Sequence, residues 1–387
     1  MTPSAEHESF RDSVRAFVQR EMTPHVAAWD EAQTFPRELY ERAAQIGLLG
    51  LGYPEAYGGT PADGWYRLIA TEEIARAGSG GLMASLFSHN IGLPPVLAHG
   101  SDALKQRILP DVLAGRRIAA LAITEPGGGS DVARLRCSAR RDGVDWVITG
   151  DKTFITSGMR ADWITLAVRT GGAGAAGVSL IAVPGDTPGL TRTALSKMGW
   201  WCSDTAQLHF QDCRVPADHL IGEENTGFRA IMENFNAERL LMSAGANAFA
   251  NVCYEEALAW ARQRQTFGTP LIERQVIRHK LMDMRMRLAS TRAWLHDLVQ
   301  RHEDHLNGRD EGSSPPDPEW VAELCLLKNH ATQTMQHCAD QAVQILGGMG
   351  FMRGTQSERI YREVKVMMIG GGAEEIMKEL AARQLGV

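Results

Sequence analysis

The sequence has 387 residues and a formal net charge of −6, and 44% of its residues are hydrophobic. These values are typical of a globular protein with two or three domains. The mild acidity argues against nucleic-acid binding, which needs a concentrated basic face, and no apolar run is long enough to span a bilayer. Six scattered cysteines form no CxxC pair, so they predict neither a zinc site nor a redox pair and fit a reducing compartment.

The first third of the chain, residues 1–117, is predicted to be an α-helical domain. Phe10, Val14, Phe17 and Val18 repeat at helical spacing. Further helices are expected at 38–49, 66–77, 81–97 and 102–113. The N-terminal segment is acidic and lacks an apolar core, which is not typical of a signal or transit peptide and predicts a cytoplasmic protein.

Residues 118–226 are predicted to form a middle β domain. Runs rich in Val, Ile, Thr and Trp are separated by Gly, Asp and Pro, and few helical patterns lie between them. This spacing favours a small β-barrel or sandwich over a parallel sheet. The strand-like runs are 118–124, 146–149, 163–168, 178–183 and 207–210.

Helical periodicity returns at residue 227 and continues to the end, which predicts a C-terminal helical-bundle domain at 227–387. The longest run covers 228–264, and another covers 321–346. Between them, the polar segment 307–318 is expected to be an exposed connector. The expected fold class is therefore α+β, in the order helical domain, β domain, helical domain.

One position interrupts the apolar stripe of the 228–264 helix. Glu238 follows Phe235 by three residues and precedes Met242 by four, on a face shared with Phe228, Ile231, Phe249 and Val252. A buried carboxyl group is either paired with a cation, here Arg239 or an arginine of another helix, or has a raised pKa. The first alternative is structural, whereas the second describes a general base.

A glycine-rich loop follows the first predicted strand, at Leu121-Ala-Ile-Thr-Glu-Pro-Gly-Gly-Gly-Ser-Asp131. Its glycines let the backbone approach a ligand closely, and Thr124 and Ser130 add hydroxyl groups. By itself the pattern is a weak signal and favours a tight turn over a ligand-binding loop. It is not a Walker loop, because no Lys-Ser or Lys-Thr follows, nor a Rossmann fingerprint, because no βαβ unit surrounds it.

Together with five later motifs, this loop resembles the flavin-dependent acyl-CoA dehydrogenases. The resemblance covers nearly the whole chain and keeps the order of the family's motifs. The later motifs are Gly150-Asp-Lys-Thr-Phe-Ile-Thr156, Lys197-Met-Gly199 with Asp204-Thr205, Val215-Pro216 with Leu220-Ile-Gly222, Arg262-Gln-Arg-Gln-Thr-Phe-Gly268 with Gln275, and Gln344-Ile-Leu-Gly-Gly-Met-Gly350 with Glu358-Arg359 and Arg362-Glu363.

The resemblance implies FAD as cofactor, with the contacts divided between two subunits. Residues 121–130 and 154–156 would surround the isoalloxazine, whereas 264–275 and 344–348 would reach the dinucleotide end across a subunit interface. A homodimer or a dimer of dimers follows. The implied FAD contacts are Leu121, Ile123, Thr124, Gly129, Ser130, Phe154, Ile155, Thr156, Arg264, Thr266, Phe267, Gln275, Gln344, Ile345, Gly347, Gly348, Ala373 and Glu375.

The catalytic base departs from the commonest family pattern. Many members place it in a C-terminal Glu-Gly-Thr loop, but this chain has Gly371 and Ala373 at the matching positions. A subset similar to the long-chain and isovaleryl-CoA enzymes carries the base at the position of Glu238, the residue that periodicity also selects. Two rivals in the C-terminal loop, Glu374 and Glu375, are better explained as first-turn acids that favour a helix N-terminus.

The resemblance implies α,β-dehydrogenation of a fatty acyl-CoA to a trans-2-enoyl-CoA, with electrons passed to an electron-transfer flavoprotein. Ser130, Asn236, Arg239 and Gly371 would contact the substrate, and no metal is expected. Two alternatives stay open. One is a specialised relative that acts on a branched or terpenoid acyl-CoA or reduces an enoyl-CoA, and the other is a non-catalytic CoA-thioester-binding protein.

Overall fold

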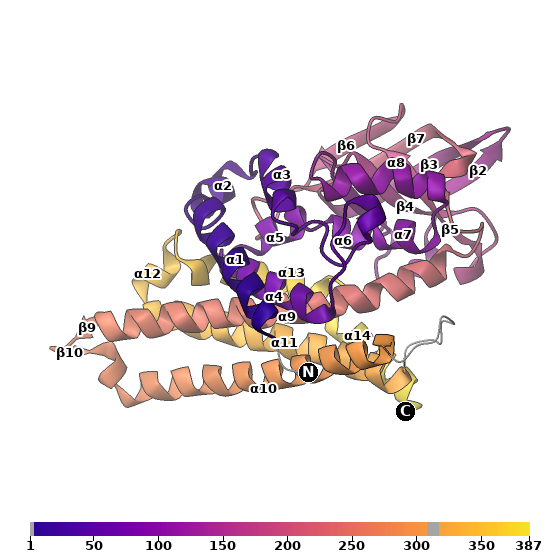
Figure 1. The fold of residues 1–387 in the computed structure, drawn as a ribbon. Coiled ribbons are helices and arrows are strands. Elements are labelled where there is room, and N and C mark those ends of the chain that lie inside the picture. Colours follow the sequence, from indigo (N-terminus) through magenta and orange to yellow (C-terminus); the bar gives the residue numbers. More distant parts are fainter. Residues whose placement is uncertain (1–3, 308–316) are drawn as a thin grey trace.

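The computed structural model describes residues 4–307 and 317–387, so the centre of the expected connector at 307–318 lies outside the described residues. Helices come first, then a β-sheet, then long helices that run side by side beneath both (Figure 1). This order confirms the predicted fold class. Among the described residues, no helix combines the length and the apolar character that crossing a membrane requires.

The N-terminal part is helical, as predicted, and the helix expected at 102–113 is found at the same bounds. The single helix expected at 81–97 is wrong, because the chain there forms three short helices. Pro94 and Pro95 begin a new helix, where the missing N–H of proline has no intrahelical partner to lose. The helices are α1 (Ala5–Glu21), α2 (Val26–Ala32), α3 (Glu38–Gln45), α4 (Gly64–Ala75), α5 (Gly80–Leu86), α6 (His89–Gly92), α7 (Pro94–His99) and α8 (Asp102–Leu113).

The middle part forms one hydrogen-bonded sheet in the order β6-β7-β3-β2-β4-β5-β8, with β1 added in parallel beside β4. Its other ladders are antiparallel apart from a single parallel β2–β4 bridge, in keeping with the few helices between the strands. Trp146 and Phe210 fill its core. The strands are β1 (Ala119–Ala122), β2 (Ser138–Asp142), β3 (Asp145–Thr156), β4 (Trp163–Arg169), β5 (Val178–Pro184), β6 (Leu190–Ala194), β7 (Thr205–Pro216) and β8 (Leu220–Ile221).

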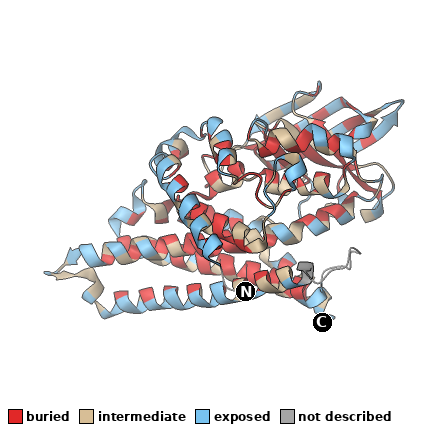
Figure 2. Ribbon diagram, viewed as in Figure 1, coloured by how far each residue is buried: buried red, intermediate tan, exposed pale blue. Residues whose placement is uncertain are grey.

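The C-terminal part is a bundle of long helices around α11, which is the most deeply buried of them (Figure 2). A small hairpin, β9 with β10, joins α9 to α10 at one tip of the molecule (Figure 1). The elements are α9 (Gly227–Gln263), β9 (Gln265–Thr266), β10 (Thr269–Pro270), α10 (Gln275–Asn307), α11 (Pro318–Leu346), α12 (Gly348–Phe351), α13 (Gln356–Ile369) and α14 (Glu374–Leu385).

Helix α9 connects the sheet to the bundle. Ile231, near its start, packs in one cluster with Ile123 at the end of β1, and Leu121 and Phe235 pack against the same cluster. Phe249, farther along, belongs to the core of the bundle. The segment of α9 between these two cores is where Glu238 lies, so the fold places this residue at the junction of two domains, where ligand sites commonly form.

Candidate active site

Glu238 lies on the side of α9 that faces the loop between α13 and α14. Its side chain is half-buried, and a Cβ atom built on Gly371 of that loop would lie 4.0 Å from Glu238 Oε1. Desolvation by burial raises the pKa of Glu238 to about 7, and the charges of Arg239 and Lys328 oppose part of this rise. The carboxyl group therefore titrates close to neutral pH, where a general base is most effective.

The ion pair that sequence reasoning left open for Glu238 is not formed with any described residue. The neighbouring Arg239 is buried, and its Nε donates to the carbonyl oxygen of Gly371 at 3.2 Å. Its Nη1 donates to Oδ1 of Asn236 at 3.1 Å. Arg239 thus holds the C-terminal loop against α9 and leaves the carboxylate of Glu238 without a direct partner.

Gly371 occupies a position that only glycine suits. Its φ of +66° lies in the left-handed region, and a Cβ atom there would lie 2.7 Å from Sδ of Met242. The N–H of Gly371 donates to no other described residue, so it is free to bind a ligand oxygen next to Glu238. The loop therefore offers a backbone donor in place of a side chain.

Lys328 of α11 completes this cluster and was missed by the sequence analysis. Its side chain is fully buried, and Nζ donates to the carbonyl oxygens of Met368 at 3.0 Å and Gly372 at 2.7 Å. Burial lowers the pKa of Lys328 to about 8, with a smaller lowering contribution from Arg239 and a raising one from Glu238. The ammonium group is therefore still charged at pH 7, fixes the loop and favours the ionised form of Glu238.

The two rival carboxylates are placed differently. Oε1 of Glu374 accepts a hydrogen bond from Lys378 at 2.7 Å, and this bond is the main reason that the pKa of Glu374 is lowered. Glu375 is exposed on the first turn of α14, for which Ala373 is the N-cap residue. A carboxylate that is paired and more acidic than usual is a poor proton acceptor, which leaves Glu238 as the better base.

The glycine-rich loop is anchored by a buried ion pair that also had no predicted role. Glu125 accepts hydrogen bonds from the backbone N–H groups of Arg136 at 2.7 Å and Cys137 at 2.8 Å. Nζ of the fully buried Lys152 donates to Glu125 at 2.8 Å and to the carbonyl oxygen of Ile123 at 2.9 Å. The loop is thus held against strand β3.

Strand β3 contains an irregularity at the three residues predicted to face the flavin. Its register against β7 shifts between Lys152 and Ile155, and Phe154 has a φ of +60°. Such bulges re-aim side chains next to functional sites. Here the ring of Phe154 is 70% exposed, Ile155 is buried in the sheet core, and Thr156 is half-buried.

These residues fit a flat, polar-edged cofactor such as FAD. Cβ atoms built on Gly127 and Gly128 would meet nothing within 4 Å, so a ligand can approach the backbone there. The hydroxyl groups of Thr124, Ser130 and Thr156 have no hydrogen-bond partner in the described part of the chain, and the exposed ring of Phe154 offers an apolar face.

The predicted contacts to the dinucleotide end lie far from Glu238 within one chain. Arg264 caps the C-terminal end of α9, and 26 residues of helix separate it from Glu238, which is about 39 Å at 1.5 Å per residue. This distance exceeds the length of one extended FAD molecule. Thr266 and Phe267 belong to the β9–β10 hairpin, Phe267 is 99% exposed, and Gln275 begins α10.

The last predicted group lies where α11 ends. Gln344 is exposed there, and Gly347 and Gly348 have open space around their backbone. The side chain of Ile345 is buried in the bundle core, so only its backbone can face a ligand. The structure therefore gathers Asn236, Glu238, Arg239, Gly371 and Lys328 into one cluster, while 264–275 and 344–348 face away from it.

Comparisons with known proteins agree with this architecture. Models of the N-terminal, middle and C-terminal domains of acyl-CoA dehydrogenases match residues 4–116, 120–213 and 225–386. The mouse mitochondrial long-chain specific acyl-CoA dehydrogenase is 36% identical over 386 residues, which are 99% of this chain and 87% of that protein.

Solved structures agree as well. A crystal structure of a candidate acyl-CoA dehydrogenase from Mycobacterium smegmatis superimposes with a TM-score of 0.94 at 46% identity, covering 99% of this chain and 98% of that one. A glutaryl-CoA dehydrogenase from the same organism, in complex with FADH2, gives a TM-score of 0.88 at 26% identity, covering 99% and 95%.

The site combines a carboxyl group of near-neutral pKa on α9, a backbone N–H at Gly371 that is free among the described residues, and an open glycine loop in the β domain. Together with the matched domains, this defines the class of oxidoreductases that act on CH–CH bonds. The chain belongs to the acyl-CoA dehydrogenase family. Members of this family depend on FAD, as the sequence motifs imply for this chain.

Proposed function

We propose that the protein removes two hydrogens from a fatty acyl-CoA, with Glu238 as the catalytic base. The observation that carries this proposal is the unpaired, half-buried carboxyl group of Glu238, whose pKa is raised to about 7. Carboxyl groups with a strongly raised pKa are frequent at catalytic sites. Its position beside Gly371 of the C-terminal loop, whose N–H is free within the described part of the chain, fits a thioester bound at these two groups.

FAD, which residues 121–130 and 154–156 would hold, would supply the acceptor for the hydride that leaves the β-carbon of the acyl chain. Glu238 takes the proton from the α-carbon, and the N–H of Gly371 donates to the thioester oxygen as negative charge develops there. Arg239 and Lys328 keep the loop in place through its carbonyl oxygens. Asn236 and Ser130 are proposed to orient the substrate.

Anaerobic titration of the purified holoenzyme with saturated acyl-CoAs tests this function. We expect the yellow flavin to bleach and to stay reduced until an electron acceptor is added, with the chain-length preference read from the affinity of each acyl-CoA. A spectral shift without lasting reduction would instead indicate a CoA-thioester-binding protein. Reoxidation by an electron-transfer flavoprotein, the proposed acceptor, can be followed in the same cuvette.

The rate should depend on pH through Glu238. Because the pKa of this group is about 7 and the base must be ionised, kcat/KM is expected to fall about tenfold for each pH unit below 7 and to level off above it. Rates measured from pH 5 to 8 check this. A midpoint near 4.5, the usual value for a glutamate, would contradict the proposed role.

We further propose a homo-oligomer, a dimer or a dimer of dimers, in which each FAD is shared. Exposed apolar side chains are frequent on the C-terminal helices, where a monomer would present them to water. They include Phe267, Val276, Met282, Met286, Met349, Phe351 and Met352. The distance from Glu238 to Arg264 supports the same arrangement.

The six buried, unpaired cysteines support a reducing compartment, for which we propose the cytoplasm.

Subunit complementation tests the shared site. In homo-oligomers, Arg264→Gln is expected to lose FAD, and Glu238→Gln is expected to keep FAD but not turn over. When both variants are co-expressed, one site of a mixed dimer combines an intact Glu238 with the partner subunit's Arg264. Activity in the mixture well above that of either variant alone is therefore expected, and no recovery would show that each chain holds its own FAD.

A further inference from the structure

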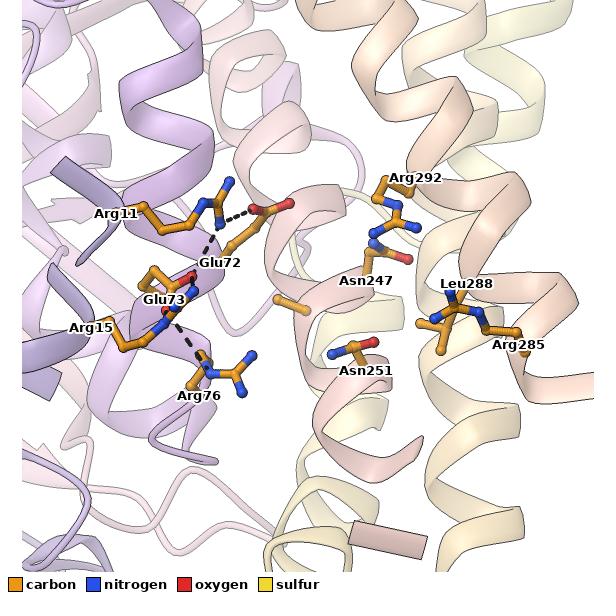
Figure 3. A pocket seen from close by; sticks show the side chains of 11 residues that line it. Arg11, Arg15, Glu72, Glu73, Arg76, Asn247, Asn251, Arg285, Leu288 and Arg292 are labelled. Atoms are coloured by element: carbon orange, nitrogen blue, oxygen red, sulfur yellow. Dashed lines mark hydrogen bonds and ion pairs between the residues drawn. The ribbon is translucent and has the colours of Figure 1, made fainter. Parts of the chain in front are cut away.

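A polar cavity lies on the opposite side of α9 from the loop that contains Gly371. This arginine pocket has a volume of about 170 Å³. Its walls come from four helices that are distant in sequence, with α1 and the C-terminal end of α4 on one side and α10 on the other (Figure 3). Its charged and polar lining includes Arg11, Glu72, Glu73, Asn247, Arg285 and Arg292.

The charges of the arginine pocket are unbalanced. On the wall formed by α1 and α4, Arg11 donates to Glu72 at 2.9 Å and to Glu73 at 3.1 Å, and Arg15 donates to Glu73 at 2.9 Å. On the opposite wall, Arg285 and Arg292 form no ion pair with a residue in the described ranges. Two guanidinium groups thus face the cavity without an anion.

Asn247 gives a second, independent sign of a ligand. It is only 6% exposed, it lines the cavity from α9, and its Oδ1 has no hydrogen-bond partner among residues 4–307 and 317–387. A buried polar atom without a partner costs about 1–3 kcal/mol. Arg285 and Arg292 are exposed, so water solvates them when the pocket is empty. A ligand with oxyanions would replace this water at the two arginines, and a hydroxyl group of the ligand would donate to the amide oxygen of Asn247.

We propose that the arginine pocket binds a compact phosphate-bearing anion. Arginine forms paired, charge-assisted hydrogen bonds with phosphate, and the volume suits a short phosphate chain over the apolar floor of Leu288 and Ala248. Asn247 follows Glu238 by nine residues on α9, which is about 13.5 Å along the helix. The pocket therefore lies apart from the carboxyl group of Glu238, and a ligand in it would link α1 and α4 to α9 and α10.

Titration calorimetry of the holoenzyme with inorganic pyrophosphate and with ATP tests this site, after FAD and CoA have filled the other phosphate-binding positions. We expect the double variant Arg285→Gln/Arg292→Gln to weaken binding of the probe by at least about tenfold, since two charge-assisted bonds are lost. Equal affinity for the two probes would identify the phosphate chain as the ligand, and tighter binding of ATP would identify a nucleotide.

Arg278→Gln is the matched control. This arginine lies on the same helix, seven residues before Arg285, and its guanidinium donates to the backbone carbonyls of Ile272 and Glu273 outside the pocket. The control should bind the probes like the wild type. Binding that is absent in the wild type, or equal in the double variant, overturns the proposal. So does a change in molecular mass of the double variant by light scattering, which would make the pocket a subunit interface. None of these results depends on the dehydrogenase assay.

Discussion

Replacing Glu238 by glutamine is expected to lower turnover by about 10²- to 10⁴-fold, the usual contribution of a general base. Glutamine keeps the shape of the side chain but cannot accept the α-proton. FAD content and acyl-CoA affinity should change little, because neither depends on this carboxylate. Stopped-flow measurement of flavin reduction isolates the chemical step from substrate binding and product release.

The same variant also has a defined effect on stability. The pKa of Glu238 is raised in the folded state, so its stabilising contribution is complete below pH 4.5 and is lost as pH rises through about 7. At pH 8 the neutral glutamine should therefore leave the protein at least as stable as the wild type.

Glu374→Gln is the matched control for the turnover of Glu238→Gln. The carboxylate of Glu374 pairs with Lys378, so this variant should keep its turnover. Unaltered flavin reduction in Glu238→Gln would remove this residue from the reaction.

Replacing Lys328 by methionine should impair both stability and the pH profile. Methionine has a similar length, but the carbonyl oxygens of Met368 and Gly372 would lose their buried donor, which costs about 1–3 kcal/mol. The loss of a nearby positive charge raises the pKa of Glu238 further, so the midpoint of kcat/KM should move up by about one pH unit. Urea unfolding and the pH–rate profile measure the two effects.

Lys365→Met provides the comparison for this result. Lys365 is exposed on α13, near the same loop, and its removal should change the free energy of unfolding by no more than about 0.5 kcal/mol. If Lys328→Met lowers stability but leaves the midpoint of the pH profile in place, Lys328 supports the loop without tuning Glu238. If neither quantity changes, the buried ammonium group has no positioning role.

The hydrophobic periodicity of the helices is enough to predict part of the site around Glu238. Glu238 is recognisable because it interrupts an apolar stripe between Phe235 and Met242, and the structure leaves its carboxylate unpaired. The same reasoning could have found Lys328, which follows Leu324 by four residues and precedes Met335 by seven. Lys328 does lie on the apolar stripe of its helix. Because a lysine on a helix is usually exposed, its residue type did not indicate burial.

Other features could not be read from one sequence. Strand β6 has no buried residue and β2 has only Ala139, so neither carries the hydrophobic pattern that marks a strand. The contact of Glu125 with Lys152 joins residues far apart in sequence, and only the fold brings them together. The stretch 81–97 is mostly apolar, so hydrophobicity gave no boundary between α5 and α6, although Pro94 and Pro95 could have marked the start of α7.

The backbone shape at Gly371 limits what the C-terminal loop can contribute to the site. Any other residue there would have to adopt a φ of +66°, and its Cβ atom would lie 2.7 Å from Sδ of Met242. A side chain at this position therefore requires a different backbone conformation and a shift of Met242 in addition to the substitution itself.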